Sequence, residues 1–283
     1  MSGQKTLRTY EPLGHALGLL ATLGLAWDEI VFSRHVIWHL FKRDFVAQFR
    51  QKIMGYCWIV IAPLMGIVPF VFLHRAGIFN PGQTEMPYPV FIVMGMGIWG
   101  FLTSAFSVVS GGLQNNQDLI MRTNIPKITF AITGMANLLY NLVVHCVVVA
   151  VFLLVMGKVP SAWAILYPLA LLPIICVGVG LGLMFSVIGT LARDLNSIMA
   201  TFLNLLMFVS PVVYQPDFEH GFLKAVTIWS PFTYLVDCPR TLFVAGYFPH
   251  VQGFIWATLF AVVVLFFGIH SFYLVKDKVA ERL

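Results

Sequence analysis

Few side chains in this chain have a type and spacing that could support chemistry. His145 lies deep inside an apolar stretch, and Asn141, four residues earlier, falls on the same face of a helix. The pair suits either a proton relay, which needs partners on other helices, or hydrogen bonding between helices worth about 0.6 kcal/mol per contact. We favour the structural interpretation. The scarcity of ionisable groups in the apolar stretches argues against a secondary transporter driven by protons or sodium.

Motifs that bind nucleotides or metals, or that carry out hydrolysis, are absent from the sequence. Gly157 and Lys158 are followed by Val159 and lack the upstream glycine of a G-x-x-x-x-G-K-[ST] phosphate loop. H-E-x-x-H, C-x-x-C and G-x-S-x-G do not occur. The four cysteines fit no metal motif, and we expect no disulfide framework. We therefore expect no cofactor or metal in this chain; the family resemblance described below implies that ATP and Mg²⁺ are bound by a separate partner polypeptide.

The composition is that of a membrane protein. Of the 283 residues, 59% are hydrophobic and 10% are charged, whereas soluble domains carry about 25% charged residues, so lipid must cover much of the surface. We predict an all-α polytopic membrane protein with six transmembrane helices, over residues 53–73, 89–113, 128–156, 164–191, 196–214 and 254–275. In the fourth, Gly178 and Gly182 form a G-x-x-x-G pair that allows close helix packing.

Positive charge is distributed unevenly around these six stretches. Most of the 17 Lys and Arg residues lie in the two terminal segments and in the connections after the second and fourth stretches. The positive-inside rule therefore predicts both termini in the cytoplasm. Because these residues flank apolar stretches, they indicate topology rather than a nucleic-acid partner. The positive residues assigned to the other side are Arg75, Lys158, Lys224 and Arg240.

We predict a cytoplasmic tail with an interfacial amphipathic helix over residues 1–52, followed by a six-span domain over residues 53–283. Residues 13–26 are apolar but too short to span a bilayer, so we interpret them as a membrane-surface segment rather than a cleaved signal peptide. Between residues 34 and 53, Ile or Phe recurs at every fourth position among Lys, Arg and other polar residues. Such a helix lies in the plane of the interface.

Two connections between the predicted spans have unusual composition. Residues 114–127 are polar, Asp118 and Arg122 are four apart, and Pro126 follows, which predicts a short helix that could dock another protein. Residues 215–250 are rich in aromatic residues and broken by prolines. We interpret this second segment as two short re-entrant helices that dip into the outer leaflet; the alternative is a small lid packed on the spans.

Two sequence patterns resemble a known family. The run A-R-D-L at 192–195, followed by an apolar helix and S-P-V-V-Y at 210–214, is similar to the R-D-x(n)-S-P-[IV]-x-Y signature of type-2 ABC exporter permeases. The pattern over residues 43–64, with R-D at 43–44, Arg50, Gly55, Trp58 and P-L at 63–64, resembles the N-terminal pattern of that family. More narrowly, the chain resembles permeases that export O-antigens, teichoic acids and capsular polysaccharides, over about residues 40–280.

The resemblance implies a homodimer in a bacterial inner membrane, bound to two copies of an ABC ATPase subunit and moving a lipid-linked polysaccharide. Residues 114–127 would form the helix that couples to the ATPase. The implied coupling residues are Asn116, Asp118, Arg122, Asn124 and Lys127. The implied cytoplasmic entrance is formed by Arg43, Asp44, Arg50, Lys52, Arg193 and Asp194.

The same resemblance places the first and fifth spans along the channel. Aromatic rings stack on the apolar faces of sugars, so aromatic residues in these spans are candidates for the glycan path; the alternative is that they face lipid. The candidates are Tyr56, Trp58, Phe70, Phe72, Phe202, Phe208 and Tyr214.

Two other functions stay open at this point. A drug or lipid exporter of the same class often carries a large extracellular domain or a fused ATPase, and neither is present in this sequence. An integral membrane enzyme that processes glycans would need a carboxylate or histidine at the membrane face. Only Arg193, Asp194 and Asp237 are placed for such a role, and the sequence shows no convergent partners for them.

Overall fold

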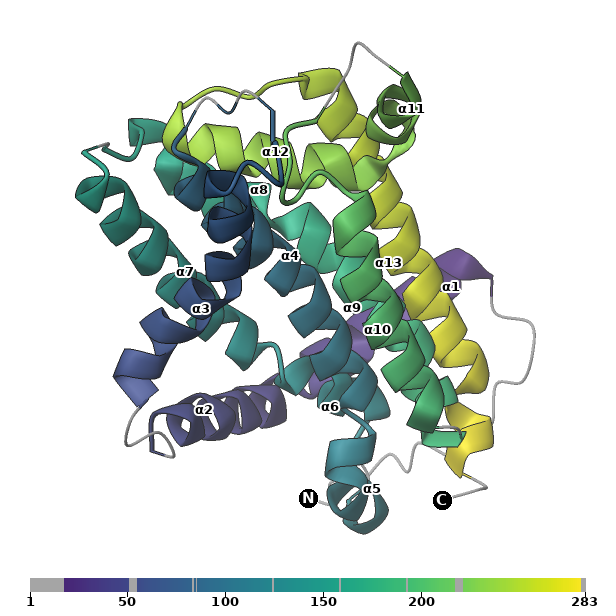
Figure 1. Ribbon diagram of the computed structural model, residues 1–283. Helices are drawn as coiled ribbons and strands as arrows, with labels where there is room; N and C mark the ends of the chain where they lie inside the picture. The colour runs from purple at the N-terminus through teal and green to yellow at the C-terminus, as the bar shows by residue number, and fades with distance from the viewer. Residues whose placement is uncertain are drawn as a thin grey trace, which may run out of the picture.

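The protein is all-helical in the computed structural model, which describes residues 18–50, 55–82, 84, 86–123, 125–157, 159–191, 193–216 and 221–280. Helix makes up 83% of the structure, and the described residues contain no strand. Long helices stand roughly side by side, and shorter helices cover the two ends (Figure 1). We call these ends the α12 end and the α5 end, after the short helices that lie there.

Four helices are long and apolar enough to cross a membrane, which makes this a multi-pass membrane protein. They cover Tyr88–Gly111, Lys127–Val155, Ala162–Gly189 and Val251–Val275, and they correspond to the second, third, fourth and sixth predicted spans. The other two predicted spans are also helical, as α3 (Gly55–Arg75) and α10 (Arg193–Val209). Their described apolar stretches, Leu64–Arg75 and Asp194–Val209, are shorter.

The centre of the bundle is a row of three helices, α4 (Tyr88–Gly111), α9 (Leu172–Leu191) and α13 (Val251–Ala280). Glycines on α9 allow backbone contact on both sides. A Cβ at Gly178 would lie 2.6 Å from the Leu102 carbonyl oxygen of α4, and a Cβ at Gly180 would lie 2.6 Å from the Val264 carbonyl oxygen of α13. The G-x-x-x-G pair therefore packs against α4, as such pairs do between membrane helices.

Two of the spanning segments are interrupted. The third consists of α6 (Lys127–Thr133) and α7 (Ala136–Val155), which meet at Gly134. A Cβ at Gly134 would lie 2.3 Å from Cγ1 of Val108, so α4 comes too close there for a larger residue. The fourth begins with a 3₁₀ turn, η2 (Ala162–Leu166), and α8 (Tyr167–Ala170), before α9. Pro168 and Pro173 lie in the first turns of α8 and α9, where a missing N–H is tolerated.

The N-terminal helices α1 (Leu19–Phe32) and α2 (Arg34–Arg50) lie outside this row. The Tyr273 hydroxyl of α13 donates to Oε2 of Glu29 on α1 at 2.6 Å. Helix α2 crosses near the α5 end and packs on α6 and α7 (Figure 1). Residues 18–26 of the predicted surface segment lie at the start of this pair, and residues 13–17 lie outside the described part of the chain. The predicted boundary at residue 52, between the tail with its interfacial helix and the six-span domain, stays a prediction.

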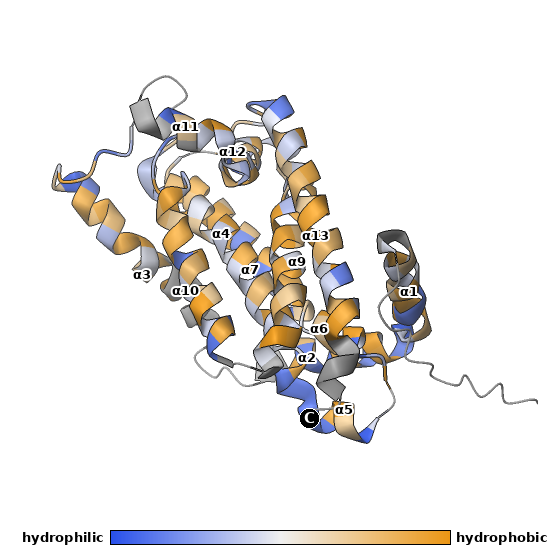
Figure 2. Cartoon of the chain, turned by 90° about the vertical axis from the view of Figure 1, so that its right-hand side faces the viewer, coloured by the Kyte–Doolittle hydropathy of each residue, from blue (hydrophilic) through white to orange (hydrophobic). Residues whose placement is uncertain are grey.

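The two connecting segments form helices as predicted. Residues 114–127 contain η1 (Gln114–Asn116) and α5 (Gln117–Arg122), while residues 215–250 contain α11 (Gly221–Trp229) and α12 (Pro231–Val244). Hydrophobic residues run along the long helices, and hydrophilic residues gather near α5 and at the outer end of α3 (Figure 2).

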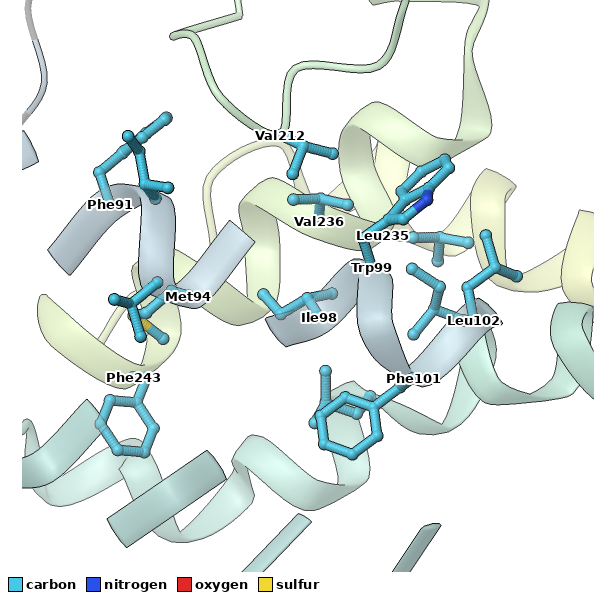
Figure 3. Packing of buried hydrophobic residues seen from close by; sticks show 14 of the residues in the cluster. Phe91, Met94, Ile98, Trp99, Phe101, Leu102, Val212, Leu235, Val236 and Phe243 are labelled. Carbon is cyan, nitrogen blue, oxygen red and sulfur yellow. The ribbon is translucent and has the colours of Figure 1, made fainter. Parts of the chain in front are cut away.

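The largest cluster of buried apolar side chains lies between α4, α12 and the turn after α10. Trp99 of α4 is 2% exposed, and its indole N–H donates to the Leu203 carbonyl oxygen at 3.1 Å. Burial of a large aromatic side chain with its polar atom satisfied stabilises the packing of α4 against α10. Figure 3 shows part of this cluster, including Phe91, Met94, Ile98, Phe101, Leu102, Val212, Leu235, Val236 and Phe243.

Candidate functional site

The S-P-V-V-Y run at 210–214 forms a turn at the α12 end, and two side chains hold its carbonyl groups. The Tyr88 hydroxyl donates to the Val213 carbonyl oxygen at 3.2 Å. The Nη2 atom of Arg240 donates to the Val212 carbonyl oxygen at 2.9 Å and to that of Pro211 at 3.4 Å. These carbonyls lie beyond the end of α10 at Val209, where no helical N–H is available to them, so side-chain donors satisfy them instead.

Arg240 is the most unusual residue of this site, because it is charged and fully buried, at 0% exposure. Its guanidinium lies over the Phe91 ring, with Cζ 3.7 Å from the ring centroid. Its Nη1 atom lies 3.9 Å from Oδ1 of Asp237, one turn earlier on α12. Burial lowers the pKa of Arg240 to about 10 while the Asp237 carboxylate acts in the opposite direction, so the group stays charged at neutral pH.

A close backbone approach completes this arrangement. A Cβ at Gly95 would lie 2.3 Å from the Val212 carbonyl oxygen and 2.5 Å from Nη2 of Arg240. Only glycine allows α4, the turn and the arginine to meet at this point. The sequence analysis counted Arg240 with the positive charges of the outer side, and it did not foresee that the residue is fully buried in α12. The spacing of Asp237 and Arg240, one helical turn apart in an otherwise apolar segment, is the signal that could have revealed it.

At the opposite end, α5 projects beyond the long helices (Figure 1). The preceding turn ties it to the bundle, since the Gln114 side chain donates to the Gly189 carbonyl oxygen of α9 and the Asn116 side chain donates to that of Gly112 at 2.9 Å. Of the predicted coupling residues, Asp118 and Arg122 are exposed, and Asn116 and Lys127 are half-buried. Asn124 lies outside the described residues.

A polar cavity of about 320 Å³ lies beside α5, between α2, α4 and α6. Arg43 and Asp44 line it and form an ion pair, with Nε 2.8 Å from Oδ1. The side chain of Asn116, predicted for coupling, lines the same cavity, and the further polar lining residues are Asn115, Thr133 and Asn137. The structure thus brings together Arg43, Asp44 and Asn116, which the sequence assigned to separate roles.

The remaining residues predicted for the cytoplasmic entrance are only partly described. Asp194 is exposed in the first turn of α10. The structure describes the backbone of Arg50 and Arg193 within α2 and α10, and Lys52 lies outside the described residues.

The predicted channel aromatics that the structure describes lie in different surroundings, and their role in a channel stays a prediction. Phe70 of α3 faces α10, where its ring centroid lies 6.4 Å from that of Phe208. Phe72 and Phe202 are exposed. The Tyr214 hydroxyl donates to the Val209 carbonyl oxygen at 2.7 Å and so closes the end of α10. Nothing is described of the side chains of Tyr56 and Trp58, the other two candidates.

The single histidine deep in the bundle has a structural partner. The Nε2 atom of His145 on α7 lies 2.8 Å from the Tyr167 hydroxyl of α8. A Cβ at Gly97 of α4 would lie 1.9 Å from the imidazole, so the ring is enclosed between three helices. These contacts support the structural interpretation of His145, since a polar pair that satisfies itself between helices needs no substrate.

Comparison with known proteins identifies a family and several relatives. The family described as ABC-2 type transporter matches residues 35–244. The chain belongs to the ABC-2 type transporter family. An O-antigen export system permease protein, RfbA, of Klebsiella pneumoniae is 22% identical over 207 residues, which cover 72% of this chain and 78% of the relative. The polysialic acid transport protein KpsM of Escherichia coli is 24% identical over 241 residues, covering 81% and 89%. An RfbA permease of Myxococcus xanthus is 20% identical over 260 residues, covering 90% and 98%.

Membership of the ABC-2 family makes the chain a transport subunit, with ATP hydrolysis carried out by a separate ATPase. The structure also separates the groups that an enzyme would need. Asp194 begins α10 near the α5 end, whereas Asp237 lies in α12 at the other end (Figure 1). The ABC-2 match starts at residue 35 and stops at residue 244, so it includes α2, α5 and the Arg240 site but leaves out α1 and α13.

Proposed function

We propose that this chain is the transmembrane subunit of an ATP-driven exporter that moves a lipid-linked polysaccharide, an O-antigen in the first instance, across a bacterial inner membrane. The observation that carries the proposal is the set of relatives named as O-antigen and polysaccharide export proteins, which match most of the chain. Both termini lie in the cytoplasm in this scheme, with the α5 end inside and the α12 end outside, as the positive-inside rule indicates.

The proposed topology has six spans, with α3 and α10 as the first and fifth. α3 has 21 residues, close to the length that a bilayer requires, and α10 has 17. Both helices have exposed apolar residues along one face, and this face would contact water if the helix lay outside the membrane. On α3 these are Ile61, Met65, Val68 and Phe72, and on α10 they are Ile198, Phe202, Leu205 and Val209. We assign these faces to lipid and to a second copy of the chain.

Helix α10 also has an exposed polar face, which supports its place beside the glycan path. Ser197, Thr201 and Asn204 are exposed and recur at helical spacing, and Phe208 continues the same line. A polar face on a membrane helix needs either water or protein beside it, because lipid cannot satisfy it. A water-filled path between two copies, with aromatic rings along it, would meet that need.

Coupling to the ATPase is assigned to α5, in two copies per exporter with two ATPase subunits. Its exposed side chains include Asp118, Met121 and Arg122, a mixture of charged and apolar groups suited to a protein surface. Through Gln114 and Asn116, a displacement of α5 would reach α9 and α4 directly. In the same scheme α11 and α12 dip into the outer leaflet, and the Arg43 cavity receives the lipid-linked end of the glycan.

The proposal is tested by deleting the gene for this chain in its source bacterium and restoring it on a plasmid. Deletion is expected to stop glycan from reaching the cell surface while lipid-linked glycan accumulates inside, and wild-type protein restores export. Replacement by Met121→Asp is expected to fail to restore export, whereas Ile78→Asp, an equally drastic change at an exposed position of the α12 end, restores it. Surface glycan that continues unchanged in the deletion strain would overturn the proposal.

The two other functions give different results in the same strains. A drug or lipid exporter would leave surface glycan unchanged and cause a labelled drug or lipid to accumulate after deletion. A glycan-processing enzyme would convert lipid-linked glycan as the purified chain alone, without ATP, and the expected result of that assay is no conversion.

A further inference from the structure

The side chain of Asn196 has no part in the roles assigned above. It lies in the first turn of α10, near the α5 end of the bundle (Figure 1). Its Oδ1 atom is buried and has no hydrogen-bond partner among the residues that the structure describes. A buried acceptor without a donor costs free energy, and each such atom in a folded protein needs a physical reason. Because protein atoms cover Oδ1, the donor that suits it is a neighbouring group of the same chain.

Asn196 meets the α5 connection at Gly189 of α9. A Cβ at Gly189 would lie 2.6 Å from Oδ1 of Asn196, so the asparagine amide lies directly against the glycine. The carbonyl oxygen of the same glycine accepts from Nε2 of Gln114, which begins the turn before α5. Gly189 belongs to the last turn of α9, where carbonyls lack a helical N–H and need other donors. Two side-chain amides, one from the α5 turn and one from α10, therefore converge on one residue.

The two amides are chemically complementary. A glutamine side chain carries two N–H donors on one nitrogen, whereas Oδ1 of an asparagine is an acceptor with two lone pairs. Gln114 donates to the Gly189 carbonyl oxygen through Nε2. The same NH₂ group can donate its second hydrogen to Oδ1 of Asn196 when a displacement of α5 brings the two side chains together. Such a bond would join α5 to α10 directly and would satisfy the buried acceptor.

Helix α10 is held at its middle by a contact that its first turn lacks. The indole N–H of Trp99 donates to the Leu203 carbonyl oxygen, and both residues are buried. Leu203 lies two helical turns beyond Asn196, or about 10 Å along the axis. Between these points, Ser197 and Thr201 belong to the exposed polar face that was assigned to the glycan path. A pull on Asn196 would therefore tilt α10 about its contact with Trp99 and move that polar face.

We propose that Asn196 is a positioning residue that passes a displacement of α5 to α10. It accepts a hydrogen bond from Gln114 when the ATPase displaces α5, and the start of α10 then moves relative to α9. The inference rests on the proposed function, because it takes α5 as the attachment of the ATPase and α10 as a wall of the glycan path. In this scheme Asn196 contacts neither nucleotide nor glycan, so its loss weakens the link between ATP hydrolysis and export.

The test uses the complete exporter, the tagged chain with its ATPase, in the deletion strain. Asn196→Ala is expected to lower surface glycan per molecule of folded protein about fivefold, while ATPase copurification and basal ATP hydrolysis stay at wild-type levels. Asn196→Asp keeps the acceptor in place and suits the first turn of a helix, so it is expected to retain most of the export. Asn141→Ala, at a half-buried asparagine of α7, is the matched control and keeps export. Wild-type export by Asn196→Ala, or folded Asn196→Asp protein without export, would overturn the proposal.

A double-mutant cycle separates one shared link from two independent contacts. Gln114→Ala and Asn196→Ala together are expected to lower export no further than the stronger single variant, because both remove the same link. Losses that multiply in the double variant would show that the two amides act independently and would reject the proposal. Surface glycan in the deletion strain tests the proposed function separately. If deletion stops export but the Asn196→Ala exporter works normally, only the role of Asn196 is rejected.

Discussion

The two ends of the molecule are built differently. At the α12 end, a fully buried arginine, a tyrosine and a glycine fix one turn through backbone carbonyls. At the α5 end, a short helix projects from the bundle and is held by two side-chain amides and by Leu119 and Ile120, which pack against a buried apolar cluster. The first arrangement resists any small change, while the second leaves a surface free for another protein. The comparison assigns rigidity to one end and attachment to the other, and substitutions can test each assignment.

The largest loss of stability is expected for Arg240→Ala. The substitution removes the donor to the turn and one member of the buried ion pair with Asp237, a change that costs about 3–5 kcal/mol. We expect the midpoint of thermal unfolding in detergent to fall steeply, with little protein recovered as a single peak in size-exclusion chromatography. Arg75→Ala, at an exposed position near the same end, serves as the control and keeps the wild-type midpoint. An unchanged midpoint for Arg240→Ala would show that the buried pair does not hold this end.

A smaller but measurable loss of stability is expected for Gly95→Ala. The added methyl group would overlap the Val212 carbonyl oxygen and Arg240, and overpacking of this kind costs about 1–3 kcal/mol. Gly100→Ala on the same helix is the matched control, because nothing lies within 4 Å of its added Cβ. Alanine is also the better helix former, so the control is expected to be neutral or slightly stabilising in the same thermal assay. Equal midpoints for the two variants would contradict the close approach.

At the α5 end, Gln114→Ala removes one of the two amide contacts to the bundle. Loss of a single hydrogen bond costs about 1 kcal/mol, so the unfolding midpoint is expected to drop slightly. Because this contact joins the α5 turn to α9, export is expected to fall more than stability does. The check is the amount of surface glycan per molecule of folded protein, compared with Gln117→Ala on α5, which leaves the contact intact. If surface glycan fell only in proportion to the amount of folded protein, the contact between Gln114 and α9 would have no separate role in export.

The smallest effect on stability, and a large one on function, is expected for Met121→Asp. The side chain is 63% exposed on α5, so the free energy of unfolding is expected to change by no more than about 0.5 kcal/mol. A charge placed in an interface with the ATPase would nevertheless weaken docking, and ATPase copurification on the tagged chain is expected to fall about tenfold. Normal copurification would show that the partner binds elsewhere, and the contrast between the two ends would then be one of rigidity alone.

The long elements of this fold could be predicted from the sequence because apolar length decides them. The apolar sequence segments that form α4, α9 and α13 are unbroken or begin at a proline. The G-x-x-x-G pair indicated which face of α9 packs closely against another helix. The division of the third stretch at Gly134 was missed, since it depends on how closely Val108 approaches from α4. Such an approach is a property of two helices together, which a linear pattern does not contain.

The candidate sites were predictable only where function requires exposure. The short helix that carries Asp118 and Arg122 could be predicted because a polar segment between spans is conspicuous, while their role in coupling stays a prediction. The burial of Arg240 was not foreseen, because it depends on Gly95 and the turn at Val212 meeting in space. The surroundings of the aromatic candidates could not be predicted from residue type alone, since Phe70 lies beside Phe208 whereas Phe72 is exposed.

The glycines that join α9 to α4 and α13 have a consequence for motion. Where the backbones of two helices are in contact, no side chain lies between them that could change its rotamer as the helices slide. The three helices are therefore expected to move as one rigid body. Opening and closing would then take place at the edges of this rigid body, where α3 and α10 carry few buried contacts. An exporter built in this way would part along the line between its two copies and leave the interior of each copy unchanged.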